Sequence, residues 1–259
     1  MIDLFGLTPA HVETFLLVWV RVSVMLFVFP IFSAPQIPQL ARVGFGLLVS
    51  FAIFHSVPLM APSHDVISLA AAVLSQVVLG LIVGFVASLV FVGIQFAGEM
   101  IDLQIGFAVA NVISPQTQQQ ITIIGELELT LATLLFLVTD SHLLLLQGIA
   151  GSFHLVTLPY IALDPSVAGN VMIFFSSALT LVFKIAAPAA VSLFLVNVAL
   201  AFMARVAPQM NVFVVGLPLQ ISVGMLMLAF SLPLLATVGP GLFSQIAHDM
   251  DTVMRGLKA

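Results

Sequence analysis

Long apolar runs separated by short polar interruptions dominate the chain. The runs occupy roughly residues 14–34, 43–61, 66–98, 127–158, 171–204 and 212–247. Because apolar residues are continuous within each run and do not alternate with polar ones, the pattern predicts helices and not barrel strands. Prolines punctuate most flanks of the runs, at Pro30, Pro35, Pro38, Pro62, Pro115, Pro159, Pro165 and Pro208. We expect an all-α, membrane-associated protein with about six long, partly broken hydrophobic helices.

Two of these runs do not fit a simple bundle of membrane spans. The run 66–98 has no charged residue and, as one helix, would be about 50 Å long, whereas the hydrocarbon core of a bilayer is about 30 Å thick. Such a helix must tilt strongly, break, or extend beyond the bilayer. Within it, Gly80 and Gly84 favour close approach of another helix. The last run contains internal prolines, each of which removes a backbone donor and favours a kink: Pro218, Pro233 and Pro240.

Composition supports a membrane location and narrows the possible chemistry. Of the 259 residues, 61% are hydrophobic and 7% are charged, and the mean hydropathy is +1.26. A soluble domain carries about 25% charged residues, so this chain cannot build a water-facing surface. With no cysteine and a net charge of −5, we expect no disulfide, no cysteine-ligated metal and no nucleic-acid partner. The N-terminus lacks a positive region, so we expect the first apolar run to remain as an anchor in lipid.

Charged residues within or beside the runs leave several interpretations open. No basic residue lies between positions 43 and 183, so the positive-inside rule gives a weak signal, and burial in a larger protein assembly would relax it. Lys184 lies inside a run, where it either faces the bundle interior or a cavity, or pairs with an acid of another chain. Arg21 shares a helix face with Glu13 and can snorkel or pair. Glu126 and Glu128 begin the fourth run, where acids suit the helix dipole.

No motif of a familiar catalytic or nucleotide-binding site occurs in the sequence. It contains no Walker, Gly-x-Gly-x-x-Gly, Gly-x-Ser-x-Gly or His-Glu-x-x-His pattern, and its six histidines lack metal-ligand spacing. Asp140, Ser141 and His142 are triad residue types, but residues adjacent in sequence do not face one another on a helix or turn. We therefore expect no enzyme activity, no cofactor and no metal, and interpret these three residues as the polar end of a helix.

One polar segment, residues 98–120, interrupts the apolar pattern near the middle of the chain. It contains two acids, six amides, two glycines and no basic residue. Hydrocarbon cannot satisfy its amides and backbone, so the segment must face water, a pore or a partner. Glu99 and Asp102 share a helix face, where they either form a solvated helix end or handle a cation or proton.

Two segments carry a specific family resemblance. One, from Gly98 to Asn111, reads Gly-Glu-Met-Ile-Asp-Leu-Gln-Ile-Gly-Phe-Ala-Val-Ala-Asn and is followed by Ser114-Pro115. The other, from Arg205 to Leu219, contains the unusual string Ala-Pro-Gln-Met-Asn and then Val-Gly-Leu-Pro-Leu. Both resemble signatures of the FliR family of the flagellar type III export apparatus, whose injectisome counterpart is the SctT family. Chain length and the order of the runs agree, so the resemblance covers essentially the whole chain.

The resemblance implies a subunit of an export gate. In that gate one copy of this chain joins several FliP and several FliQ subunits in the bacterial inner membrane, within the flagellar basal body. The gate conducts unfolded flagellar subunits, and other export-apparatus membrane proteins such as FlhB are expected partners. The resemblance also implies a FliP-like part over about 1–165 and a FliQ-like helix hairpin over about 166–259.

Specific residues follow from the same resemblance. In the family, a loop matching about 105–120 projects into the channel and plugs it. Carried onto this chain, the plug residues are Gly106, Phe107, Ala108, Val109, Asn111, Val112, Ser114 and Pro115. Polar residues expected to serve assembly or gating are Glu99, Asp102, Lys184, Arg205, Pro208, Gln209 and Asn211.

Two other functions remain as alternatives. A stand-alone secondary transporter would use an intramembrane polar site near Glu99, Asp102 and Lys184, and it requires interrupted helices in corresponding halves of the chain. An intramembrane hydrolase would use residues 140–142 and ranks last, because the three side chains cannot meet.

Overall fold

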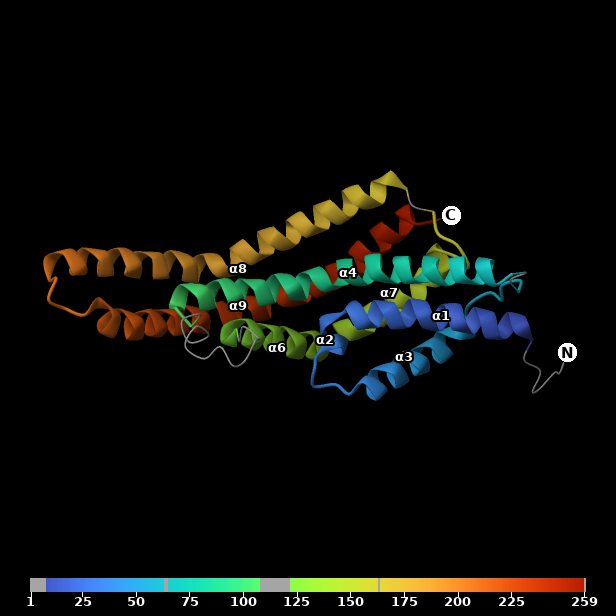
Figure 1. Cartoon of the computed structure of the whole chain (residues 1–259), viewed down its shortest axis with the longest axis horizontal. Coiled ribbons are helices and arrows are strands. Elements are labelled where there is room, and N and C mark those ends of the chain that lie inside the picture. The colour runs from blue at the N-terminus through green and yellow to red at the C-terminus, as the bar shows by residue number, and fades with distance from the viewer. Residues whose placement is uncertain (1–7, 63–64, 108–121, 163, 259) are drawn as a thin grey trace. The chain divides into compact units, whose positions relative to one another are not determined.

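The computed structural model describes residues 8–62, 65–107, 122–162 and 164–258, and every regular element among them is a helix (Figure 1). This confirms the predicted all-α class. The helices in chain order are α1 (Pro9–Val28), α2 (Pro30–Ser33), α3 (Gln39–Phe54), α4 (Val66–Ile105), α6 (Ile123–Val138), α7 (Ser141–Leu155), α8 (Pro165–Val206) and α9 (Val212–Gly256).

The described helices provide fewer candidate membrane spans than the six apolar runs suggest. Four helices, α1, α4, α8 and α9, are long and apolar enough to cross a membrane, and a fifth span results if α6 and α7 are taken together. The run 43–61 yields α3, whose 16 residues extend about 24 Å and fall short of the hydrocarbon core. The run 127–158 divides into α6 and α7, which meet at a bend of 77°.

The three longest helices are continuous. Helix α4 has 40 residues, α8 has 42 and α9 has 45, so each is about 60 Å or more in length. The run 66–98 is therefore not broken, so α4 either tilts strongly or extends beyond the bilayer. Prolines inside α8 and α9 do not end these helices: Pro188, Pro218, Pro233 and Pro240.

By contacts the chain forms two compact units, which are described separately. Unit 1 comprises residues 1–89, 140–175 and 243–259, and unit 2 comprises residues 90–139 and 176–242. Each unit draws on chain before and after residue 165, so the contact units interleave along the sequence. The predicted division into a FliP-like part and a FliQ-like hairpin stays a prediction.

In unit 1, helix α1 packs against α3 and α4. A Cβ atom added to Gly80 would lie 2.8 Å from Val24 Cβ, and one added to Gly84 would lie 3.1 Å from the Met25 carbonyl oxygen. Real Cβ atoms do not tolerate the first distance, so the absence of a side chain lets α4 approach the backbone of α1. The close approach predicted from these two glycines is confirmed.

Unit 1 also contains a fully buried arginine. Arg21 on α1 has no exposed surface; its Nε donates to Gln76 Oε1 on α4 at 2.7 Å, and its Nη1 donates to the carbonyl oxygens of Ser152 and Val156, at 3.0 and 2.9 Å. The guanidinium carbon lies 4.3 Å from the centroid of the Phe153 ring, a cation–π geometry. Of the two alternatives for Arg21, snorkelling is excluded by its burial, because the side chain is bound internally by Gln76 and by carbonyl groups at the C-terminal end of α7.

The start of α8 and the end of α9 meet in unit 1. The N–H groups of Ala162 and Asp164 donate to the carbonyl oxygens of Leu257 and Gly256, both at 3.3 Å. Asp164 precedes α8, and its Oδ1 accepts the Ser166 N–H at 2.7 Å, as an N-cap side chain does. Hydrogen bonds from the Ser166 hydroxyl and N–H lower the pKa of Asp164 below its usual value.

Unit 2 is built on the second half of α4, on α6, and on the paired middle and far parts of α8 and α9. The last two run antiparallel: Ser192 Oγ lies 3.2 Å from Met227 Sδ, and Gln220 hydrogen-bonds Asn197. Their apolar faces and α4 enclose a buried core consisting of Ala97, Ile101, Ile105, Ile124, Val182, Ala186, Ala189, Leu193 and Leu228. This core contains the C-terminal end of α4, in which the polar segment 98–120 begins.

Candidate functional site at the base of the polar segment

Helix α4 ends at a glycine that adopts a left-handed conformation. Gly106 has φ +92°, a value that favours glycine over residues with a side chain. The N–H groups of Gly106 and Phe107 both donate to the Asp102 carbonyl oxygen at 3.2 Å, which closes the last turn in the manner of a helix C-cap. Phe107 then packs against the buried core of unit 2, so the chain is anchored as it leaves α4.

The Asp102 side chain caps the next helix. Its Oδ2 accepts hydrogen bonds from the N–H groups of Ile124, at 3.0 Å, and Gly125, at 3.3 Å. These are the donors that an N-cap side chain normally satisfies, yet Thr122 at the N-cap position of α6 makes no side-chain cap bond. A carboxylate from α4 replaces it and also faces the positive end of the α6 dipole.

Two glycines bring the backbones of α4 and α6 into contact at this point. A Cβ atom added to Gly98 would lie 2.7 Å from Gly125 Cα, and one added to Gly125 would lie 3.0 Å from Glu99 Cγ. A side chain at Gly98 would require the backbone to move, and one at Gly125 would require its neighbours to shift by a few tenths of an ångström. The two chain ends that flank residues 108–121 are thus held together by the Gly98–Gly125 contact and by the Asp102 cap.

The predicted acidic pair therefore divides into two environments. Asp102 is 4% exposed, so a solvated helix end is the wrong interpretation for it, whereas Glu99 is partly exposed. The pattern of the sequence also missed the burial of Glu128, which is 1% exposed, while Glu126 in the first turn of α6 is exposed. The helix dipole accounts for Glu126 but does not explain a buried carboxylate two residues further along.

The remaining predicted site residues are placed as follows. Ala108, Val109, Asn111, Val112, Ser114 and Pro115 lie outside the described residues, and only Gly106 and Phe107 of the predicted plug are described. Lys184 is an exposed residue of α8. The residues of the second motif lie at the turn between α8 and α9, where all four are exposed: Arg205, Pro208, Gln209 and Asn211.

The triad residue types occupy the bend between α6 and α7. Asp140 adopts φ 55°, and its carbonyl oxygen accepts the Leu143 N–H at 3.0 Å as α7 begins. His142 Nδ1 is buried and has no hydrogen-bond partner within the described part of the chain, so no proton relay from His142 Nδ1 to Asp140 or Ser141 is formed. This geometry fits the polar helix end that the sequence indicated. Among the described residues, no group of three His, Asp or Glu side chains is placed to hold a metal ion.

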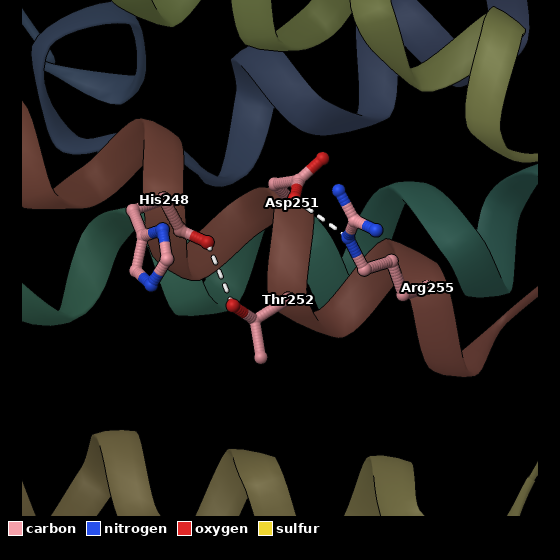
Figure 2. Close-up of polar contacts among 4 residues, drawn as sticks. All are labelled: His248, Asp251, Thr252 and Arg255. Atoms are coloured by element: carbon pink, nitrogen blue, oxygen red, sulfur yellow. Dashed lines mark hydrogen bonds and ion pairs between the residues drawn. The ribbon is translucent and has the colours of Figure 1, made fainter.

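Not every polar cluster in the structure has the character of a site. Figure 2 shows four residues near the end of α9, where Arg255 Nε lies 2.8 Å from Asp251 Oδ2 and Thr252 Oγ1 donates to the His248 carbonyl oxygen at 2.9 Å. Both contacts join residues four apart on one helix, and the ion pair is solvent-exposed. Such a pair contributes about 0.3–0.5 kcal/mol, so it supports the helix end locally.

The comparisons with known proteins decide the family. The model of the family described as "Bacterial export proteins, family 1" matches residues 12–246. The chain belongs to this family, that of FliR. It is 35% identical to the flagellar biosynthetic protein FliR of Bacillus subtilis over 98% of this chain and 96% of the relative.

Two further relatives show that the similarity extends to a second flagellar protein and to a translocation protein. The flagellar biosynthetic protein FliR of Escherichia coli is 32% identical over 92% of this chain and 91% of the relative. The Yop proteins translocation protein T of Yersinia pestis is 30% identical over 63% of this chain and 64% of the relative. The chain is therefore a component of the type III export apparatus, and the family resemblance of the two motifs is confirmed.

Proposed function

We propose that this chain is the FliR-type subunit of a flagellar type III export gate, which with FliP and FliQ homologues forms the channel for unfolded flagellar subunits. The FliR proteins of Bacillus subtilis and Escherichia coli match 98% and 92% of the chain, whereas the Yersinia translocation protein matches 63% of it, which favours the flagellar assignment. The gate lies in the bacterial inner membrane within the flagellar basal body, with FlhB among its neighbours. The chain contributes structure, and energy comes from other components.

Helix lengths and exposure support a role inside a multi-subunit assembly. Helices of about 60 Å exceed the hydrocarbon core, and only 22% of the most apolar part of α8 and 17% of that of α9 is buried, against 61% for α4. Large apolar faces outside the bilayer need protein cover. Subunits of the FliP and FliQ type, packed on α8 and α9, provide that cover in the proposed gate.

The plug of this gate is the segment 105–120. The observation that supports this assignment is the Asp102 clamp, by which we mean the cap that the Asp102 side chain forms on α6. This one residue fixes the end of α4 and the start of α6 and so gives the intervening residues a rigid base. Apolar Phe107, Val109 and Val112 close the pore against ions, and the amides that follow tolerate water when the pore opens.

A replacement of the segment tests this role. We expect that exchanging residues 108–117 for a Gly-Ser sequence of equal length preserves the chain length, removes the apolar side chains and raises the ion permeability of the cell membrane. Substituting Gln118, Gln119 and Gln120 by serine is the matched control, since it exchanges polar for polar residues. Unchanged ion permeability together with unchanged secretion in the Gly-Ser variant would refute the plug.

A stand-alone transporter is not favoured. That function requires interrupted helices in corresponding halves of the chain. In the described residues one pair, α6 and α7, is bent by more than 40°, and α4 runs uninterrupted past Glu99 and Asp102. Membership of an export-protein family also argues for a subunit of a larger channel.

A further inference from the structure

Unit 2 contains a pocket that the proposed function does not use. It has a volume of about 170 Å³ and lies between α6, α8 and α9. Its walls are mostly apolar, with Leu181, Ile185 and Leu235 among them. Three polar side chains also line it: Glu128 from α6, Lys184 from α8 and Ser231 from α9.

Glu128 is the feature that demands a partner. Its Oε2 is buried and accepts no hydrogen bond from any described residue. A carboxylate in apolar surroundings is costly unless a cation or strong donors compensate it, and membrane proteins place such groups against partners. The pocket beside Glu128 is large enough to admit the end of a long side chain.

Lys184 is the cation on the same pocket. It is the one amine among the lining residues, and its flexible four-carbon stem presents three donors at its end. Ser231 supplies a further acceptor: its hydroxyl donates to the Leu228 carbonyl oxygen at 2.9 Å, which leaves lone pairs on Oγ for an ammonium group. Within unit 2 the acids Glu99, Asp102, Glu126 and Glu128 outnumber the bases Lys184 and Arg205, so a lysine turned inward also improves the local charge balance.

We infer that the pocket is a binding site for the chain's own Lys184, which turns inward, pairs with Glu128 and donates to Ser231. The pair fastens the first turns of α6 to the middle of α8 and α9. It explains why a lysine interrupts an otherwise apolar helix and why a glutamate is buried in a wall of leucines. The inference is independent of the plug, because it concerns described side chains of one unit and its tests do not read secretion.

A double-mutant cycle on the full-length protein in detergent-solubilised membranes tests the pair. Glu128→Gln alone and Lys184→Gln alone each lower the midpoint of heat precipitation by on the order of 5 °C, because the first removes the charged partner of Lys184 and the second leaves the buried Glu128 carboxylate unpaired. The double neutral variant loses no more than either single variant, and the exchange Glu128→Lys with Lys184→Glu recovers part of the loss. Additive losses, or a Glu128→Gln variant that matches the wild type, would overturn the inference.

Matched controls come from the same chain. Glu126→Gln removes an exposed carboxylate from the same helix, and Lys258→Gln removes the chain's other lysine, which is also exposed. Both controls keep the wild-type midpoint if burial in the pocket is what matters.

A covalent measurement on the wild-type chain covers the case in which the variants fail to fold. A membrane-permeant carbodiimide activates a carboxylate, and an amine in contact then forms an amide, with release of the reagent as a urea and net loss of one water from the protein. Mass spectrometry is expected to find the Glu128–Lys184 amide and no amide between Glu126 and Lys184. Recovery of Glu128 and Lys184 unlinked, whether or not Glu128 carries the reagent, contradicts the pair.

Discussion

The two units each bury a charged side chain, and the two solutions differ. Arg21 in unit 1 donates to one side-chain amide and to two carbonyl oxygens at 2.7 to 3.0 Å, all in the interior, and its Nη2 is buried without a hydrogen-bond partner among the described residues. Asp102 in unit 2 accepts two N–H groups through Oδ2, while its Oδ1 is buried and has no hydrogen-bond partner in the described part of the chain. Arg21 joins three helices, whereas Asp102 joins the end of α4 to the start of α6, on either side of residues 108–121.

This difference separates a buried charge that stabilises a whole unit from one that holds the base of a single segment. Arg21 connects α1 with α4 and with the C-terminal end of α7, three helices of unit 1, so we expect its loss to weaken the unit as a whole. Asp102 connects α4 to α6 across the segment 108–121, so its loss frees the base of that segment and leaves most of the core intact. Buried charges in membrane proteins are therefore not equivalent, and the partners decide whether stability or gating depends on them.

The largest effect is expected at Arg21. Arg21→Met keeps most of the volume but leaves Gln76 Oε1 and the Val156 carbonyl oxygen without the Arg21 donors, while the Ser152 carbonyl oxygen keeps the Val156 N–H. The expected loss of stability is on the order of 3 kcal/mol, because two buried acceptors become unsatisfied and the cation–π contact with Phe153 is lost. Thermal unfolding of the full-length protein in detergent measures it.

Arg21→Lys is the matched control for that change. It keeps the positive charge but replaces a planar fork of donors by a single ammonium group, so an intermediate loss is expected. If Arg21→Met unfolds at the wild-type temperature, Arg21 does not lock unit 1 and the proposed contrast with Asp102 fails.

A smaller loss of stability, with a larger effect on the gate, is expected at Asp102. Asp102→Ala leaves the Ile124 and Gly125 N–H groups without an acceptor, and loss of a helix cap costs about 1–2 kcal/mol. If residues 105–120 act as the proposed plug, the ion permeability of the membrane is expected to rise in the same variant, because the cap that joins the end of α4 to the start of α6 is lost.

Asp102→Asn separates the hydrogen bond from the charge. Asparagine is also a good capping residue, so this variant is expected to stay within a few tenths of a kcal/mol of the wild type. Equal permeability of the alanine, asparagine and wild-type proteins would show that the clamp does not govern the segment.

The smallest effect is expected at the exposed pair on α9. Asp251→Asn removes the ion pair with Arg255 shown in Figure 2, and the expected change in unfolding free energy is at most about 0.5 kcal/mol. Raising the salt concentration should reduce even that difference. A loss comparable to that of Arg21→Met would mean that burial does not determine how much a charged residue contributes to the stability of this protein.

Much of the fold follows from local patterns in the sequence. Continuous apolar runs predicted the helices, and Gly80 and Gly84 predicted a close helix contact that the structure confirms against α1. The six runs correspond to α1, α3, α4, the bent pair α6 and α7, α8 and α9, and four or five of these are long and apolar enough to span a membrane. Hydropathy did not indicate how short α3 is or that the chain bends at Asp140. Both depend on backbone geometry at a few positions, which an average over a run does not resolve.

The candidate site was predictable in location but not in its chemistry. The polar segment and its two acids were evident as an anomaly, and the left-handed Gly106 lies within the quoted motif. Asp102 as the cap of α6 was missed because its partners lie 22 and 23 residues further along the chain. A signal existed: Gly125 directly precedes the acidic start of α6, where a close backbone approach would need a glycine.

By itself the sequence determined the helical class, the family and the position of the polar segment, because periodicity, hydropathy and motif strings are properties of neighbouring residues. Only the tertiary structure decided which charges are buried and what they bind. Arg21 reaches Ser152 across 131 residues and Gln76 across 55, and Glu128 is enclosed by helices that begin far from it in the chain. Burial is a property of packing among distant helices, and the free energy of a charge depends on that packing more than on its neighbours in sequence.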